Sequence, residues 1–357
     1  MPVNKTLETV INGGIPTKDE LTALIDTFVA GGDESAEIYE CARAKAESLR
    51  DLHYGRRVFL RGLIEFTSYC KNDCYYCGLR RSNRNAERYR LTKEQILECA
   101  DYGASLGFHT FVLQGGEDGH FTDAKLCEIV SEIKSAHPDC AVTLSVGERS
   151  YESYKALRNA GADRYLLRHE TATAEHYSRL HPANLTLENR KRCLYDLKSL
   201  GFQVGAGFMV GSPYQKSENL AEDLLFLREF SPQMVGIGPF IPHRDTPFGE
   251  CTPGTLKLTL LMLALTRLML PKVLLPATTA LGTIASDGRE RGVLAGANVV
   301  MPNLSPVDVR KKYLLYNDKL CSGDETAEHI KELRERFSKI NCTLDMSRGD
   351  SKNVQGD

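Results

Sequence analysis

Three cysteines stand close together in the segment TSYCKNDCYYCGLRR, at Cys70, Cys74 and Cys77. Their C-x3-C-x2-C spacing lets three thiolates hold three corners of a cubane 4Fe-4S cluster. The fourth iron of such a cluster would have no protein ligand. It could therefore bind the amino and carboxylate groups of a small molecule directly.

An open iron of this kind suits the reductive cleavage of S-adenosylmethionine (SAM). One electron from the reduced cluster would enter the sulfonium and break the S–C5′ bond, giving methionine and a 5′-deoxyadenosyl radical. The cofactors would carry out this chemistry, while the protein would position them and exclude water. Tyr76, just before the last cysteine, could pack on the adenine or simply cover the cluster.

A structural zinc site is the other interpretation of the cysteine motif. Zinc in such sites takes four nitrogen or sulfur ligands, and no fourth Cys or His lies close by in the sequence. The chain has 11 cysteines, an odd number, and no recognisable export signal. A disulfide framework is therefore not expected, and most of the scattered cysteines are expected to be small core residues.

The elements that must hold the motif alternate between helix and strand patterns close to eight times. This alternation indicates parallel strands with crossover helices, and the count favours a closed (β/α)8 TIM-type barrel in the α/β class. The predicted strands are residues 58–66, 109–114, 141–146, 163–168, 203–210, 234–240, 273–279 and the end of 288–301. We expect an N-terminal helical segment at 1–55, the barrel at 56–320, and a C-terminal extension at 321–357 whose polar tail after Lys339 is partly disordered.

The active site of such a barrel forms at the C-terminal ends of the strands, so the polar residues there should converge. Arg168 ends a predicted strand and would point into that space. Thr143 and Ser145 lie at i and i+2, so they face one side of a strand, as site residues or as a polar packing layer. Thr278 and Thr279 are neighbours, so only one of them can face inward on an ideal strand.

Bulk composition excludes some classes of partner. The chain has 357 residues and a net charge of -2, so it shows no electrostatic footprint for nucleic acid or an anionic membrane. The longest apolar stretch, around 256–275, is interrupted by Lys257, Arg267 and Pro271, which makes it unsuited to span a bilayer. We expect a cytoplasmic protein with no membrane or nucleic-acid partner.

Beyond the cysteines, the chain resembles a known family over roughly residues 58–321. The matching strings are RRSNRNAERYRLTKEQI, FVLQGGED, AVTLSVGE, AGADRYLLRHETATAEHYSRLHP, GAGFMVGSP, MVGIGPFIPHRDTP, LPATTALGT and AGANVVMPNLSP. Together they resemble the HydE family of FeFe-hydrogenase maturases, in the branch of the radical SAM superfamily that also holds biotin synthase and methylornithine synthase.

The resemblance implies roles for individual residues. It implies that Cys70, Cys74 and Cys77 ligate the cluster, and that Glu170 and Arg190 bind the amino group and carboxylate of SAM; a structural ion pair is the other interpretation of these two. It further implies that Gln114, Gly115 and Gly116 line the SAM and substrate side, although the glycines could simply form a tight turn. The residues implied to line an anion-friendly substrate cavity are Arg168, Thr143, Ser145, Thr278 and Thr279.

The resemblance also implies a substrate and partners. HydE-like proteins cleave SAM in the assembly of the hydrogenase H-cluster, on an organometallic iron–cysteine synthon that carries carbon monoxide and cyanide and comes from a partner maturase. The alternatives are a mutase of the same branch that resembles methylornithine synthase, and a non-catalytic iron–sulfur carrier or scaffold. One departure is visible: Cys321 matches the first ligand of a second cluster found in many HydE sequences, but the C-x2-C pair that would complete it is absent.

Overall fold

The computed structural model describes residues 4–321 and 326–353. Its strands are β1 (Arg57–Leu60), β2 (Gly62–Thr67), β3 (Thr110–Gly115), β4 (Ala141–Ser145), β5 (Arg164–Leu166), β6 (Gln203–Ala206), β7 (Met209–Val210), β8 (Met234–Val235), β9 (Gly238–Pro239), β10 (Val299–Val300) and β11 (Thr343–Asp345). Its helices are α1 (Lys5–Ile11), α2 (Lys18–Ala30), α3 (Gly32–Tyr54), α4 (Lys93–Ser105), α5 (Asp123–Ala136), α6 (Tyr151–Asn159), α7 (Ala174–Leu180), α8 (Leu187–Ser199), α9 (Ser217–Phe230), α10 (Leu256–Met269), α11 (Thr279–Ile284), α12 (Gly288–Leu294), α13 (Val307–Arg310) and α14 (Ile330–Ser338), with a short 3-10 helix at Ala327–His329.

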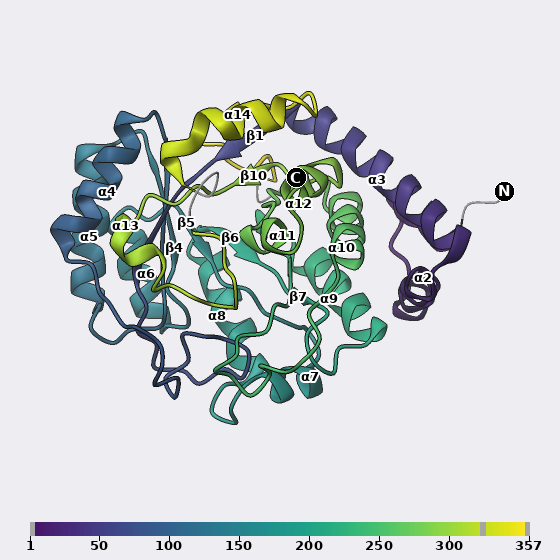
Figure 1. Ribbon diagram of the computed structural model, residues 1–357, viewed down its shortest axis with the longest axis horizontal. Helices are drawn as coiled ribbons and strands as arrows, with labels where there is room; N and C mark the ends of the chain where they lie inside the picture. Colours follow the sequence, from purple (N-terminus) through teal and green to yellow (C-terminus); the bar gives the residue numbers. More distant parts are fainter. Residues whose placement is uncertain (1–3, 322–325, 354–357) are drawn as a thin grey trace.

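A parallel sheet closes on itself at the centre of the molecule. Six strands pair in the order β2-β3-β4-β5-β6-β8. The extended chain at Leu274–Pro276 then bridges Met234 on one side and Val299 on the other, and Leu63 of β2 bridges Asn303 to complete the circle. Helices surround the strands (Figure 1). The predicted (β/α)8 barrel is thus confirmed, with the seventh and eighth positions held by isolated bridges and the short strand β10.

Three predicted strands are broken in the middle. Residues 58–66 fall on β1 and β2, which are separated at Arg61. Residues 203–210 form β6 and β7, and residues 234–240 form β8 and β9. The break between β6 and β7 lies at Gly207, where φ is +147°, a value that interrupts regular strand geometry. A Cβ atom on Gly207 would lie 2.0 Å from the carbonyl oxygen of Gly236, so the two strands approach too closely there for any side chain.

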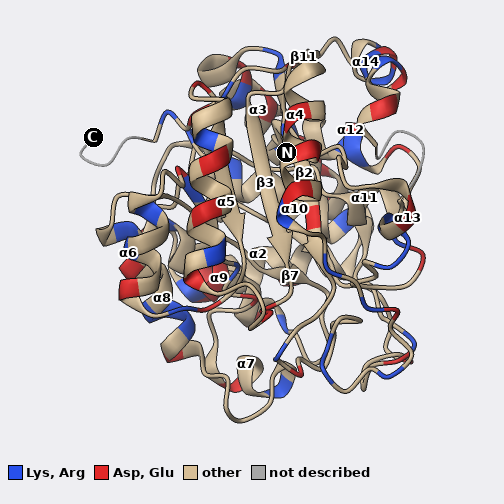
Figure 2. Ribbon diagram, turned by 90° about the vertical axis from the view of Figure 1, so that its left-hand side faces the viewer, with Lys and Arg blue, Asp and Glu red and all other residues tan. Residues whose placement is uncertain are grey.

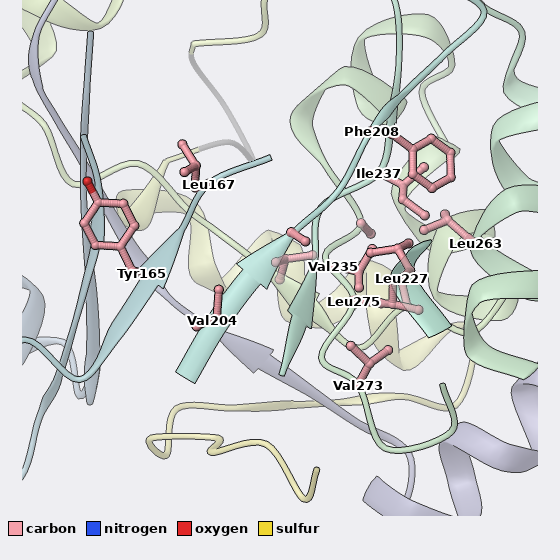
Figure 3. Packing of buried hydrophobic residues seen from close by; sticks show 14 of the residues in the cluster. Tyr165, Leu167, Val204, Phe208, Leu227, Val235, Ile237, Leu263, Val273 and Leu275 are labelled. Carbon is pink, nitrogen blue, oxygen red and sulfur yellow. The ribbon is translucent and has the colours of Figure 1, made fainter. Parts of the chain in front are cut away.

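The main core lies between the strands and the surrounding helices. Val204 and Val235 are fully buried on the outer side of the barrel, where they belong to one cluster with Leu227 of α9 and Leu263 of α10 (Figure 3). Threonine side chains cap several barrel helices: Thr92, Thr122 and Thr186 accept hydrogen bonds from the first-turn N–H groups of α4, α5 and α8. These caps fix where each helix begins after its loop.

The C-terminal segment differs from the frayed tail that the sequence predicts. Thr343–Asp345 forms β11, which pairs with β1, and residues 346–353, here called the C-terminal strap, continue across the N-terminal ends of the strands. Nη2 of Arg164 donates to Oδ1 of Asp350 at 2.7 Å, and Gln203 donates to the same oxygen at 2.8 Å. Pairing with buried strand ends orders this polar segment, a contact that its composition does not reveal.

The two ends of the barrel therefore differ. The strap and β11 cover the N-terminal ends of the strands, while long loops gather at the opposite end of the molecule, where α7 lies (Figure 2). Within the described residues, none of the helices combines the length and apolar character needed to cross a bilayer.

Candidate active site

A cavity of about 350 Å³ opens at the C-terminal ends of the barrel strands. All residues predicted for the site except Thr143 line it: Cys70, Cys74, Tyr76, Cys77, Gln114, Gly115, Gly116, Ser145, Arg168, Glu170, Arg190, Thr278 and Thr279. They come from loops and strand ends that are up to about two hundred residues apart in the chain, so the barrel alone brings them together.

The three cysteines lie on the loop after β2, which other parts of the chain hold in place. The guanidinium of Arg88 donates to the carbonyl oxygens of Leu79 and Arg80 at 2.9 and 2.7 Å. Tyr75 donates its backbone N–H to Leu180 at 3.0 Å. The loop is therefore fixed both by its own arginine and by the end of α7.

The thiols of this loop are close enough to influence one another. Burial, together with the neighbouring Cys70, raises the pKa of Cys77 to about 12, and burial with Cys77 raises the pKa of Cys74. The described residues contain no group of three His, Cys, Asp or Glu side chains placed to hold a single metal ion. A structural zinc ion takes four nitrogen or sulfur ligands, whereas three cysteines can hold three irons of a cubane, so the ligand set of this loop suits a cluster.

Glycine is required next to the cluster loop. A Cβ atom on Gly116 would lie 2.2 Å from the carbonyl oxygen of Tyr69, and one on Gly115 would lie 2.7 Å from the Thr67 side chain. The tight-turn interpretation does not hold, because Gly115 ends strand β3 and neither glycine has a positive φ. Glycine is needed here because the backbone and the Thr67 side chain approach too closely for a Cβ atom, and its small size leaves the cavity open beside Cys70. Gln114 donates from Nε2 to the hydroxyl of Tyr313 at 3.4 Å, which sets the direction of its amide.

Glu170 and Arg190 do not pair with each other, so the alternative prediction of a structural ion pair between them is wrong. Glu170 instead pairs with Arg168, whose Nη2 lies 2.6 Å from Oε2. Arg190 pairs with Glu148 across 2.6 Å between Nε and Oε1. Each charged group of the predicted pair thus has its own counter-ion at the cavity wall.

Several buried polar atoms around the cavity have no hydrogen-bond partner among the described residues. They include Oγ1 of Thr278. Buried polar groups are nearly always satisfied, so such an atom marks a place where a polar ligand fits. Two charged groups at the same wall, Glu117 and Arg190, face the counter-ions Lys71 at 3.3 Å and Glu148 at 2.6 Å. SAM carries both an ammonium and a carboxylate, and these two charges match them in sign.

Tyr76 is held in place by His181, a residue that was not predicted for the site from the sequence. Nδ1 of His181 is bonded to the carbonyl oxygen of Tyr177 at 3.0 Å, which places the proton there and leaves Nε2 to accept from the Tyr76 hydroxyl at 3.2 Å. Burial, followed by the charge of Arg190, lowers the pKa of His181 to about 4. The neutral ring therefore fixes the orientation of Tyr76.

The threonines differ from the strand-based expectation. Thr143 is buried outside the cavity, with an unpartnered Oγ1 among the described residues, which agrees with the polar-layer interpretation. Thr278 and Thr279 both line the cavity. Thr278 stands at the N-cap position of α11 without a side-chain capping bond, and Thr279 is the first helical residue, so the inward-or-outward alternation of a strand does not apply.

One wall of the cavity consists of residues that were not predicted from the sequence. Lys319 pairs with Glu65 across 2.7 Å, both side chains being almost fully buried, and Tyr313 and Tyr316 lie on the same C-terminal segment. The backbone of this segment reaches the cluster loop, since Gly78 donates to Leu315 at 2.8 Å. No motif marks these residues. The one signal in the sequence is Glu65, a charged residue inside a predicted buried strand, which indicates that a positively charged partner must lie beside it.

Comparison with known proteins agrees with this geometry. The model of the radical SAM superfamily matches residues 64–227. The chain is 49% identical over 276 residues to the FeFe-hydrogenase maturase subunit HydE of Thermotoga maritima, covering 77% of this chain and 78% of that protein. It is 29% identical over 344 residues to a 3-methylornithine synthase of Methanosarcina acetivorans, covering 96% and 91%.

Solved structures share the fold. The crystal structure of a methylornithine synthase superposes with a TM-score of 0.78 at 26% identity, covering 95% of this chain and 97% of that one. The maturase HydG superposes equally well, with a TM-score of 0.78, but at 17% identity it supports the fold alone.

A match to the radical SAM superfamily implies a 4Fe-4S cluster and SAM as cofactors. It also argues against the non-catalytic carrier or scaffold. The identity to HydE extends over most of both chains, well beyond the cysteine motif. The chain therefore belongs to the HydE family of FeFe-hydrogenase maturases and is an enzyme of the radical SAM superfamily.

Proposed function

We propose that the enzyme cleaves SAM reductively in the assembly of the FeFe-hydrogenase H-cluster, on an iron–cysteine synthon carrying carbon monoxide and cyanide. The observation that carries the proposal is the convergence of the three cysteines, Arg168 and Glu170 on one cavity. The identity to HydE supports the choice of substrate. Other hydrogenase maturases would supply the synthon and receive the product.

Cys70, Cys74 and Cys77 would hold the cluster at the cavity mouth. When bound, the cluster and SAM together supply a 5′-deoxyadenosyl radical. The residues that would hold SAM are Tyr76, Gln114, Gly115, Gly116, Glu170 and Arg190. The positive charge of Arg190 at the cavity wall suits the SAM carboxylate, and the tightly packed loops around the cavity would exclude water.

The substrate would lie deeper, beside Arg168, Ser145, Thr278 and Thr279. A ligand that bears cyanide and a carboxylate is anionic, and charged hydrogen bonds from a guanidinium are strong in a dry site. The unpartnered hydroxyl of Thr278 adds a neutral donor at this wall.

In this proposal the barrel of residues 56–320 carries the chemistry, while the described parts of the segments 1–55 and 321–357 cover its outside and its floor. We place the enzyme in the cytoplasm. All 11 cysteines are free thiols in the structure, which suits a reducing compartment.

A test would supply the reconstituted, reduced enzyme with SAM and the iron–cysteine synthon and follow 5′-deoxyadenosine over time. The proposal predicts that the synthon accelerates SAM cleavage and is consumed with it. The alternative, favoured by the likeness to 3-methylornithine synthase, is a mutase acting on lysine, which has the same atoms as 3-methylornithine. Acceleration by lysine with formation of 3-methylornithine, and no effect of the synthon, would establish that alternative.

A further inference from the structure

Glu170 lies in a strained turn at the end of β5. Its φ is +65°, one of a handful of positive values at residues other than glycine. Thr171 donates its backbone N–H to the carbonyl oxygen of His169 at 2.8 Å, which closes a three-residue turn around Glu170. Such a conformation is strained and persists only where the surrounding structure holds it.

His169 and Asp223 hold this turn from the outer side of the barrel. Gly207 donates its N–H to Nδ1 of His169 at 3.2 Å, so the ring proton of a neutral imidazole is on Nε2. That nitrogen lies 3.2 Å from Oδ1 of Asp223, on α9. The same oxygen accepts the backbone N–H of Ala172 at 2.5 Å. One carboxylate oxygen therefore fixes the chain on both sides of Glu170.

The two side chains are sealed from solvent. Both have a side-chain exposure of 0%. The ring of Phe226, one turn along α9 from Asp223, lies 4.8 Å from the imidazole. Burial lowers the pKa of His169 and raises that of Asp223, so the ring stays neutral. Burying polar groups costs free energy unless hydrogen bonds compensate for the lost water. Here the compensating bonds of both side chains lie around one turn.

We propose that His169 and Asp223 are positioning residues for SAM, which act through Glu170. By holding the turn, they aim the side chains of Arg168 and Glu170 at each other and into the cavity. The inference rests on the proposed role of Glu170 towards SAM. In this inference, helix α9, which packs on the outer side of the strands, sets the geometry of the cofactor site through Asp223.

The test compares variants of the reconstituted enzyme. Asp223→Ala removes the accepting oxygen, whereas Asp223→Asn can keep an oxygen facing the two donors. His169→Phe keeps the aromatic packing but loses both ring bonds, and it carries the test if Asp223→Ala does not fold. Leu224→Ala, a buried neighbour on the same helix, is the matched control for general destabilisation.

We expect Asp223→Ala and His169→Phe to raise the KM for SAM about tenfold or more, with kcat changed much less, because a misplacement near 1 Å can cost this much. Asp223→Asn and Leu224→Ala should stay near the wild-type KM. Hydrogen exchange on the chain before reconstitution should show that the amides of residues 170–172 lose protection in Asp223→Ala but not in Leu224→Ala.

Two results would overturn the inference while leaving the proposed function in place. One is an unchanged KM in Asp223→Ala and His169→Phe when Glu170→Gln does raise it. The other is an equal rise in Leu224→Ala. An unchanged KM in Glu170→Gln itself would instead show that the assignment of Glu170 in the proposed function is wrong, and the inference would fail with it.

Discussion

Arg168 and Glu170, two residues apart in the chain, form an ion pair at the cavity wall with Nη2 and Oε2 separated by 2.6 Å, while Nε of Arg168 donates to the other oxygen at 3.1 Å. This fork orients both side chains before any ligand arrives. The Arg168 side chain is 28% exposed and lines the cavity, so a ligand can reach it. The pair joins the proposed SAM side of the cavity to the proposed substrate side.

Removing the guanidinium should weaken substrate use more than SAM binding. We expect Arg168→Met to lower the synthon-dependent rate of SAM cleavage about tenfold to a hundredfold, since charge-assisted hydrogen bonds to an anion are worth about 1.5–3 kcal/mol. The measurement is 5′-deoxyadenosine formation with and without the synthon. A variant that still responds to the synthon as the wild type does would contradict the role of Arg168.

Arg190 should act on SAM rather than on the substrate. Its side chain lines the cavity, and its Nε lies 2.6 Å from Oε1 of Glu148. We expect Arg190→Met to raise the dissociation constant of SAM at least tenfold, which equilibrium binding would measure. Glu148→Gln should have a smaller effect, because it leaves the guanidinium in place. Equal SAM affinity in Arg190→Met and wild type would rule this role out.

The C-terminal strap should contribute to stability. Asp350 is the carboxylate partner of Arg164, whose side chain is fully buried. We expect Asp350→Ala to lower the free energy of unfolding by about 1–3 kcal/mol, because it leaves a buried guanidinium without its carboxylate and with only neutral acceptors on Arg348 and Thr110. Denaturant unfolding would measure the change, with the exposed Asp26→Ala on α2 as the control. A loss no larger than in the control would mean that the strap is not held by this contact.

His181 should make stability depend on pH. Burial, with the charge of Arg190, lowers its pKa to about 4. Because the unfolded chain binds the proton near pH 6.5 and the folded protein near pH 4, stability is complete above pH 6.5 and falls as the pH drops through this window. The loss amounts to about 3 kcal/mol. Urea unfolding of the cluster-free chain should give a flatter profile for His181→Phe, and parallel profiles would refute this.

The barrel could be predicted from the sequence because its evidence is periodic. Strands such as 109–114 and 141–146 alternate with amphipathic helices, and this pattern does not depend on distant contacts. The breaks at Gly207 and Gly236 could not be predicted in this way, because they arise from a contact between two strands. The order of the C-terminal strap also depends on a distant partner, the buried Arg164.

The candidate site likewise contains residues that the sequence identifies and residues that only the folded structure reveals. Cys70, Cys74 and Cys77 lie close in sequence, and their spacing states the chemistry directly. Lys319 and Tyr316 reach the cavity only because the chain returns after the last strand, so no local pattern marks them. His181 carries an ordinary sequence context, and its role becomes visible only through its bond to Tyr76.

The central claim is that the three cysteines hold a cluster that cleaves SAM. The most direct measurement reconstitutes the protein anaerobically with iron and sulfide, reduces it, adds SAM and assays 5′-deoxyadenosine by chromatography. Cys74→Ala is the test variant, and Cys127→Ala, a thiol outside the motif, is the matched control. The account predicts product from the wild type and Cys127→Ala and none from Cys74→Ala. A wild-type protein that binds a cluster but forms no 5′-deoxyadenosine, or a Cys74→Ala variant as active as the wild type, would contradict it.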